Sequence, residues 1–109
     1  LVAESVRRGL FSLPGAMTPS EVFAAWRAGA HAVKLFPAGS LGVGHVRAMC
    51  AVLPPALPLL AVGGVTPDNL AGCSGAGLGS DLYRPGQSAA QTGKRAAAFV
   101  TAWQAAQPA

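Results

Sequence analysis

One of the two lysines in this 109-residue chain lies inside an apolar run, Ala32-Val33-Lys34-Leu35-Phe36-Pro37. No Asp or Glu lies near Lys34 in the sequence. Burying an unpaired ammonium is costly, so such a lysine tends to lose its proton, and a neutral amine attacks carbonyl carbons. Lys34 is therefore a candidate for covalent catalysis. The alternative is a lysine at a strand end whose stem packs while its ammonium reaches water.

Two glycine-rich stretches end apolar segments later in the chain. Gly63-Gly64 follow the segment Leu59–Val62, and Gly77-Leu78-Gly79-Ser80-Asp81 end the segment that begins at Gly75. Glycine lets backbone N–H groups approach an anion closely, and a helix start adds the positive end of its dipole. Either stretch alone fits an ordinary turn. Together with Lys34 on the preceding strand, they indicate a phosphorylated carbonyl substrate that faces an amine.

The length of the chain, residues 1–109, indicates one domain or part of one, and its composition predicts elements buried on more than one side. Hydrophobic residues make up 51% of the chain and charged residues only 11%. The most apolar window, Ala51 to Val65, contains three prolines and falls short of the ~18 uninterrupted apolar residues of a membrane helix. The net charge of +4 comes from scattered arginines. This pattern indicates mild attraction for an anionic substrate rather than a nucleic-acid surface.

The cysteines bear on the cellular location of the chain, and its first residue bears on whether an N-terminal part is absent. Cys50 and Cys73 lie far apart, with no partner at metal-ligand spacing. We expect both to be reduced core thiols in a cytoplasmic protein. The sequence starts at Leu1 inside a helical pattern and has no secretory signal. We therefore expect that it was cut from something longer, with an N-terminal half absent.

Apolar segments and helix signals alternate along the chain. The expected strands are Leu10–Leu13, Ala32–Phe36, Leu59–Val62 and Gly75–Leu78. The expected helices are one around Val2 and Val6 that stops at Gly9, one from the capping box Thr18-Pro19-Ser20-Glu21 to Gly29, one over His45–Leu53, a short one from Thr66-Pro67-Asp68 to Ala71, and one over Ser88–Gln104 with Phe99, Val100 and Trp103 on its inner side. This alternation indicates a parallel sheet covered by helices.

An internal repeat favours a (β/α)8 barrel over a doubly wound sheet. Gly15-Ala16-Met17-Thr18-Pro19 is matched by Gly64-Val65-Thr66-Pro67, and Ala28-Gly29-Ala30 by Ala71-Gly72-Cys73. No Gly-x-Gly-x-x-Gly fingerprint follows the first strand. Four βα units make only half a barrel, because a complete one takes roughly 250 residues. The second repeat is also too short for a full crossover helix, which normally needs about a dozen residues in all.

Four longer motifs carry a resemblance to a known family. They are Pro14-Gly15-Ala16-Met17-Thr18-Pro19-Ser20-Glu21, Val33-Lys34-Leu35-Phe36-Pro37, Ala61-Val62-Gly63-Gly64-Val65-Thr66-Pro67 and Gly77-Leu78-Gly79-Ser80-Asp81-Leu82-Tyr83. Together they resemble the C-terminal half of a family of class I aldolases, those for 2-keto-3-deoxy-6-phosphogluconate and 2-dehydro-3-deoxy-6-phosphogalactonate. Val62 and Asp81 look more like the galactonate branch, since the gluconate branch tends to carry threonine and tryptophan there.

The resemblance implies a homotrimeric TIM (β/α)8-barrel enzyme of galactonate catabolism, without metal or organic cofactor. It would cleave the phosphorylated keto-deoxy acid reversibly to pyruvate and D-glyceraldehyde 3-phosphate. Lys34 matches the family's Schiff-base lysine, and Phe36 matches an aromatic that packs against bound pyruvate. The positions that match the phosphate-binding residues are Gly63, Gly64, Gly79 and Ser80. The gluconate substrate is the alternative within the family.

The resemblance also shows what the chain lacks. The family's acid/base glutamate, and the arginine and threonine that hold the pyruvate carboxylate, lie on earlier strands. Three carboxylates present are not well placed to replace that glutamate: Glu4 lies in the first helix, Glu21 in a capping box and Asp81 in a phosphate loop. We therefore expect this chain alone to be impaired or inactive.

Several roles and functions stay open at this point. We expect His31 and His45 at the surface, and Tyr83 and Arg84 are candidates to flank the phosphate. A non-catalytic half-barrel that binds phosphorylated sugars or assembles with another chain is one alternative function. Another phosphate-binding barrel enzyme, such as a phosphate-dependent synthase, is a second, but such an enzyme has no need of Lys34.

Overall fold

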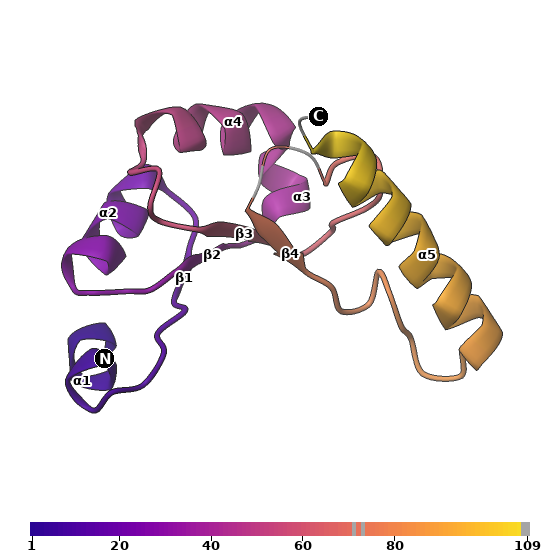
Figure 1. Cartoon of the computed structure of the whole chain (residues 1–109), viewed down its shortest axis with the longest axis horizontal. Coiled ribbons are helices and arrows are strands. Elements are labelled where there is room, and N and C mark those ends of the chain that lie inside the picture. Colours follow the sequence, from indigo (N-terminus) through magenta and orange to yellow (C-terminus); the bar gives the residue numbers. More distant parts are fainter. Residues whose placement is uncertain (71, 73, 108–109) are drawn as a thin grey trace.

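The computed structural model of the chain describes residues 1–70, 72 and 74–107. Within these residues, four parallel strands form one sheet in the order β1-β2-β3-β4 (Figure 1). The strands are β1 (Gly15–Ala16), β2 (Val33–Leu35), β3 (Leu59–Val62) and β4 (Gly75–Gly77). The helices are α1 (Val2–Arg7), α2 (Pro19–Arg27), α3 (Ala38–Leu41), α4 (Val43–Val52) and α5 (Ala89–Ala106). The predicted parallel α/β sheet is thus confirmed.

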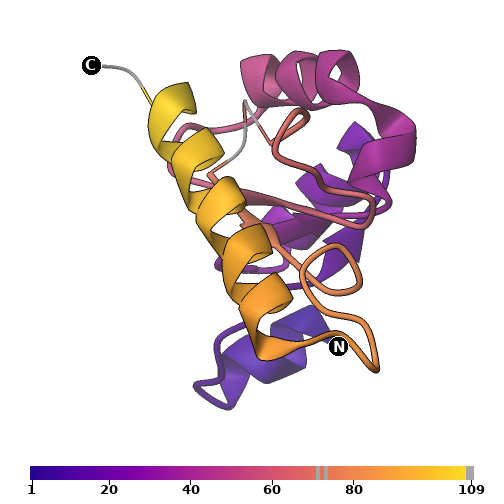
Figure 2. The same cartoon turned by 90° about the vertical axis from the view of Figure 1, so that its right-hand side faces the viewer.

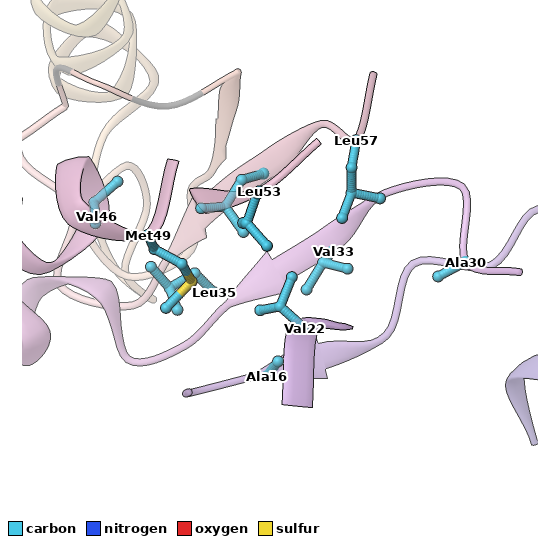
Figure 3. Packing of buried hydrophobic residues seen from close by; sticks show 10 residues of the cluster. Ala16, Val22, Ala30, Val33, Leu35, Val46, Met49, Leu53 and Leu57 are labelled. Carbon is cyan, nitrogen blue, oxygen red and sulfur yellow. The ribbon is translucent and has the colours of Figure 1, made fainter. Parts of the chain in front are cut away.

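Helices α2, α3 and α4 cover one face of the sheet. Val33 and Leu35 of β2 are 0% exposed. Val22 of α2 lies beside Val33, and Met49 of α4 lies beside Leu35 (Figure 3). Because side chains alternate along a strand, the half-buried Lys34 points to the opposite face. In Figure 1 that face is the open underside of the sheet.

Helix α5 packs at the β4 end of the sheet (Figure 2). Phe99 is buried in a second apolar cluster with Ala61, Val65 and other residues. Trp103 is half-buried, and Val100, although 55% exposed, lines a hollow together with Phe99 and Trp103, so Val100 lies at the exposed margin of the predicted inner side. Successive helical residues are rotated by about 100°, which places Val100 at the edge of the face that Phe99 occupies. No helix in the described part of the chain is long and apolar enough to cross a membrane.

The start of α2 is the predicted capping box. Glu21 N donates to Thr18 Oγ1 at 3.3 Å, and Thr18 N donates to Glu21 Oε2 at 2.8 Å. Met17 N donates to the same carboxylate oxygen at 2.9 Å. Pro19 follows the cap at a position whose N–H would have no helical partner. The hydrogen bonds from Met17 and then Thr18 hold the pKa of Glu21 below its ordinary value of 4.5.

This lowered pKa predicts a stability change in acid. Since the folded state binds the proton of Glu21 less readily than the unfolded state, the cap contributes fully above about pH 4.5 and is lost as pH falls through the folded pKa. Glu21→Gln should therefore lower stability at pH 7 and make the unfolding midpoint less sensitive to pH below 4.5. Thermal unfolding between pH 3 and 7 measures both effects. A variant whose pH profile matches the unchanged chain would contradict this role.

The first strand is not where the sequence placed it. The structure has β1 at Gly15–Ala16, and the predicted strand Leu10–Leu13 is wrong. Ser12 O does accept from His31 N at 3.0 Å, so the segment runs beside the chain that leads into β2. Ser12 N, however, donates to His31 Nδ1 at 3.0 Å, and Pro14 has no N–H. The ladder therefore forms only after Pro14.

The predicted helix after Thr66 is wrong within the described residues. Thr66 N donates to Asn69 Oδ1 at 2.7 Å, and Asn69 N donates back to Thr66 O at 3.2 Å, which makes a turn. The start signal is present, but too few residues follow it for a helix. Ala71 and Cys73, at the end of the expected helix and in the matching repeat, lie outside the described residues.

The remaining elements agree closely with the predictions. Strand β3 has the predicted bounds, while β4 and the helices α4 and α5 differ from theirs by one or two residues at their ends. The four-residue helix α3 was not predicted. Cys50 was expected in the core and is exposed; its Sγ donates to Gly72 O at 3.3 Å, and partial burial raises the pKa of its thiol.

Candidate active site

Lys34 lies in the middle of the open face of the sheet. Its register partners are Gly15 on β1 and Leu60 on β3. A Cβ on Gly15 would lie 3.3 Å from Lys34 Cε, so glycine leaves room for the lysine stem. Lys34 has no carboxylate oxygen within 4.0 Å among the described residues, where only Glu4 forms ion pairs. Lys34 is half-buried rather than buried as expected, because no element covers this face.

The Lys34 side chain opens into a hollow of about 480 Å³. The hollow is lined by Leu13, Lys34, Leu60, Val62, Ala76, Gly77, Leu78 and Gly79. It therefore joins Lys34 to Gly79, one of the predicted phosphate positions. Its walls are otherwise mostly apolar, so the carbon chain of a substrate could pack beside Lys34.

Phe36 links Lys34 to the loop after β3. Its ring centroid is 5.6 Å from Lys34 Nζ. The ring also packs against Gly63, where a Cβ would lie 2.6 Å from Phe36 Cε2. Gly63 has a φ of +87°, which other residues adopt only with strain. The structure thus brings three predicted residues, Lys34, Phe36 and Gly63, to one place.

These two constraints make Gly63 sensitive to substitution. Gly63→Ala should cost about 1–3 kcal/mol of unfolding free energy through the strained backbone, and more if the Phe36 ring cannot move. Urea unfolding measures the cost. The matched control is Gly44→Ala in α4, where a Cβ meets nothing within 4 Å and alanine should stabilise the helix by up to about 1 kcal/mol. Equal effects of the two changes would contradict this account.

The loop after β3 turns its carbonyl groups toward α3 and Asn69. Gly63 O accepts from Gly39 N at 2.8 Å, and Gly64 O accepts from Asn69 Nδ2 at 2.9 Å. A Cβ on Gly39 would lie 2.5 Å from Gly64 O, so α3 approaches this loop closely. Within the described part of the chain, the N–H groups of Gly63, Gly64 and Val65 have no hydrogen-bond acceptor. They are available to an anion.

The loop after β4 likewise uses carbonyl groups in hydrogen bonds and leaves N–H groups free among the described residues. Gly79 O accepts from Leu82 N and Tyr83 N, both at 3.0 Å. The N–H groups of Gly79, Ser80 and Asp81 have no acceptor among the described residues. Two adjacent loops therefore offer free backbone donors at the carboxyl ends of neighbouring strands, which is how proteins commonly bind phosphate.

The other titratable candidates are held by local contacts. Glu21 caps α2, and Glu4 pairs with Arg7 and Arg8, whose hydrogen bonds lower the pKa of Glu4. His31 is exposed, stacks on Phe11 and accepts from Ser12 N. His45 is half-buried, with Nε2 3.4 Å from Met17 O.

Of the two residues predicted to flank the phosphate, Tyr83 is exposed and Arg84 bonds to Ser80. Three contributors to the site were missed. They are Gly15 beside Lys34, Gly39 beside Gly64, and Arg95, whose Nη1 donates to Asp81 O at 3.4 Å. All three act through contacts with residues distant in the sequence, and only Gly15 stood in a motif.

The family model for "Aldolase: KDPG and KHG aldolase" matches residues 1–74, more than half of the chain. The chain belongs to this aldolase family. It is 49% identical over 111 residues to the 2-dehydro-3-deoxy-6-phosphogalactonate aldolase of Escherichia coli (strain K12), across 97% of this chain and 54% of that relative. The resemblance seen in the motifs is thereby confirmed.

Two solved structures are similar to this aldolase chain. One is named "Native KDPGal structure", with a TM-score of 0.85 and 49% identity over 96% of this chain and 53% of the other. The second is a "cube-shaped, highly porous protein cage designed by fusing symmetric oligomeric domains", with a TM-score of 0.85 and 50% identity over 97% of this chain and 41% of the other.

The aldolase chain thus spans about half the length of the relatives it matches. Its four sequential parallel strands, covered by helices on one face, are half of a TIM (β/α)8 barrel, as predicted. The open face corresponds to the barrel interior. The two glycine loops lie at the carboxyl ends of β3 and β4, where such barrels carry their active sites, and the hollow beside Lys34 reaches Gly79 of the second loop.

Proposed function

We propose that this chain carries the Schiff-base lysine and the phosphate loops of a class I aldolase for 2-dehydro-3-deoxy-6-phosphogalactonate. One observation carries the proposal: Lys34, with no carboxylate partner among the described residues, opens into the same hollow as Gly79. An amine and an anion site that share one hollow suit a substrate with a keto group at one end and a phosphate at the other. The name of the Escherichia coli relative supports the choice of substrate.

In this proposal the Lys34 amine attacks the C2 carbonyl of the substrate, and loss of water leaves an imine. A base takes the proton of the C4 hydroxyl as the C3–C4 bond breaks. The protonated imine accepts the electron pair of that bond, which releases D-glyceraldehyde 3-phosphate and leaves an enamine. Protonation at C3 and hydrolysis then release pyruvate and restore the amine. Phe36 packs beside the pyruvate carbons.

The phosphate end is assigned to the loops after β3 and β4. The free N–H groups of Gly63, Gly64, Gly79 and Ser80 would donate to its oxygens, with no metal or organic cofactor required. Such donors are strong toward a charged acceptor and need no reorganisation when the substrate binds. Binding of the phosphate would place the keto group in the hollow beside Lys34.

A non-catalytic half-barrel that binds phosphorylated sugars is the second candidate. One observation favours it: Glu4 and Glu21 are held in an ion pair and a cap, so neither is free to move protons at Lys34. Both candidates would bind phosphate. Only the aldolase would form an imine with pyruvate.

Reductive trapping therefore tests the proposed function. The chain is incubated with pyruvate and sodium borohydride, and the intact mass and the modified peptide are measured. We expect one reduced pyruvate on Lys34 and none on Lys94, the exposed lysine of α5, which serves as an internal control. Labelling of both lysines to the same extent, or of neither, would favour the non-catalytic half-barrel.

The proposed assembly and location follow the relatives. A homotrimer of completed barrels is the proposed state, and the use of a related chain in a cage built from symmetric oligomeric domains supports an oligomer. A cytoplasmic location stays a prediction from the low cysteine content. The proposed ligand is a small phosphorylated acid, rather than nucleic acid or a membrane.

The branch assignment predicts a substrate preference. When the first half of a relative's barrel is supplied in trans or by fusion, the enzyme should prefer the galactonate-type substrate over its C4 epimer. Both substrates share the pyruvate and phosphate ends, so the difference rests on few contacts and should be ~1–3 kcal/mol, or roughly 10–200-fold in kcat/KM. Steady-state kinetics with the two substrates measures it. Equal or reversed values would refute the branch and leave the family intact.

A further inference from the structure

The loop after β4 is held by its carbonyl groups. Four consecutive carbonyl oxygens, those of Gly79, Ser80, Asp81 and Leu82, each accept a hydrogen bond. Gly79 O is bonded within the loop, and Leu82 O accepts from Gln87 Nε2 at 2.8 Å. All four carbonyls are thus fixed, while the N–H groups of the first three residues stay free among the described residues.

Two arginines hold the middle of this loop. Arg84 Nε donates to Ser80 O at 3.0 Å, and Arg95 Nη1 reaches from α5 to Asp81 O at 3.4 Å. Both also line a hollow of about 220 Å³, together with Thr66, which follows β3, and Asp81, which follows β4. Neither guanidinium forms an ion pair in the part of the chain that the structure describes. Their positive charge is therefore not neutralised by a carboxylate.

Peptide geometry connects these bonds to the free donors. In a trans peptide the C=O of one residue and the N–H of the next point in opposite directions. A bond that fixes Ser80 C=O therefore also fixes the direction of Asp81 N–H. A bond to Asp81 C=O fixes Leu82 N–H, which donates to Gly79 O and so fixes Ser80 N–H. Arg84 thus fixes the free N–H of Asp81, the residue that follows the assigned phosphate donor Ser80, and Arg95 acts on Ser80 N–H itself through one more hydrogen bond.

We propose that Arg84 and Arg95 are positioning residues that hold the loop after β4 with its N–H groups directed at the substrate phosphate. This inference rests on the proposed function, since it deepens the phosphate site assigned there. The two guanidinium groups also add positive potential at the loop, which favours a bound anion there. Of the two arginines, Arg84 has the larger effect on phosphate binding, because its hydrogen bond is shorter and directly fixes a peptide that carries a free N–H group.

The test is titration of the ¹⁵N-labelled chain with inorganic phosphate. In the unchanged chain the amide signals of Gly79, Ser80 and Asp81 should shift and give a dissociation constant. Arg84→Gln should weaken phosphate binding about tenfold, in line with the loss of one charge-assisted hydrogen bond. Arg95→Gln should weaken it less, and Arg84→Lys, which keeps a charged donor, should retain most of the affinity.

Arg27→Gln on α2 is the matched control, because it removes the same charge far from the loop. It should leave the phosphate affinity within about twofold, and pyruvate trapping at Lys34 should be unchanged in all variants. Unfolding midpoints show whether each variant is folded. If Arg84→Gln and Arg27→Gln weaken phosphate binding equally, or if neither weakens it, the positioning role of the arginines is wrong but the proposed function stands. If phosphate shifts no loop amide in the unchanged chain, the phosphate site of the proposed function fails, and this role fails with it.

Discussion

Replacing Lys34 by methionine is expected to abolish reductive trapping of pyruvate. Methionine has a stem of nearly the same length, which fits beside Gly15 and Phe36, but it has no nitrogen to form an imine. Lys34→Arg is a second variant that keeps the positive charge, and its guanidinium also forms no imine. Both should lose the pyruvate adduct completely, as measured by intact mass after borohydride reduction.

The control for this loss is Lys94→Met on α5, which should trap pyruvate as the unchanged chain does. Circular dichroism and the unfolding midpoint show whether the Lys34 variants still fold. They should, because Lys34 lies on the open face and contributes little to the buried cluster of Val33 and Leu35. An adduct that persists in folded Lys34→Met would show that another amine reacts, and the central assignment would be wrong.

The parts of the fold that depend on local chemistry could be predicted from the sequence. The capping box at Thr18 and Glu21 satisfies backbone donors within four residues, so it specifies the start of α2 by itself. Strand β3 is an apolar run between Pro58 and Gly63, and its predicted bounds are those observed. In both cases the signal and the structure lie in the same short segment.

The structure differs from the predictions where a residue distant in the sequence makes a contact, or where a connection is too short for the predicted element. Ser12 N is taken by His31, 19 residues away, and this contact cannot be read from Leu10–Leu13. The Thr66-Pro67 signal resembles that of Thr18-Pro19, yet the connection to β4 is too short to use it.

The residues of the candidate site also differ in whether the local sequence reveals them. Lys34 and Gly63 could be identified from residue type and motif. Arg95 could not, because its partner Asp81 lies 14 residues away and becomes a neighbour only when α5 packs at the β4 end of the sheet. The acid/base group could not be found in this chain either, since Glu21 serves as a cap.

By itself, this chain is expected not to be a stable, fully active monomer. Strands β1 and β4 are both edges with unpaired backbone groups among the described residues, and the face that carries Lys34 and Leu60 is uncovered. Leu10, Phe11 and Leu13 beside β1 are also exposed.

The short connection between β3 and β4 increases this exposure. It leaves a hollow of about 250 Å³ between β4 and α5, lined by Leu70, Ala76, Leu78, Phe99, Val100, Trp103 and Gln104. Apolar surface of this extent is rarely left open in a monomer. Pairing with another half-barrel would cover the sheet edges and the open face, and aggregation is the alternative.

Sedimentation at low micromolar concentration should therefore show dimers or larger species. Leu60→Asp places a charge on the open face and should shift the chain toward monomer, whereas Val52→Asp on the exposed side of α4 should not.

A lactate dehydrogenase-coupled assay for pyruvate should show turnover lower by about 10²–10⁴-fold than that of a complete relative, because proton transfer by a positioned carboxylate contributes about that much. Activity should thus be lost more sharply than folding. A folded monomer with ordinary aldolase turnover would show that half a barrel is sufficient, and that a residue of this chain supplies the proton transfer assigned here to the unmatched half of its relatives.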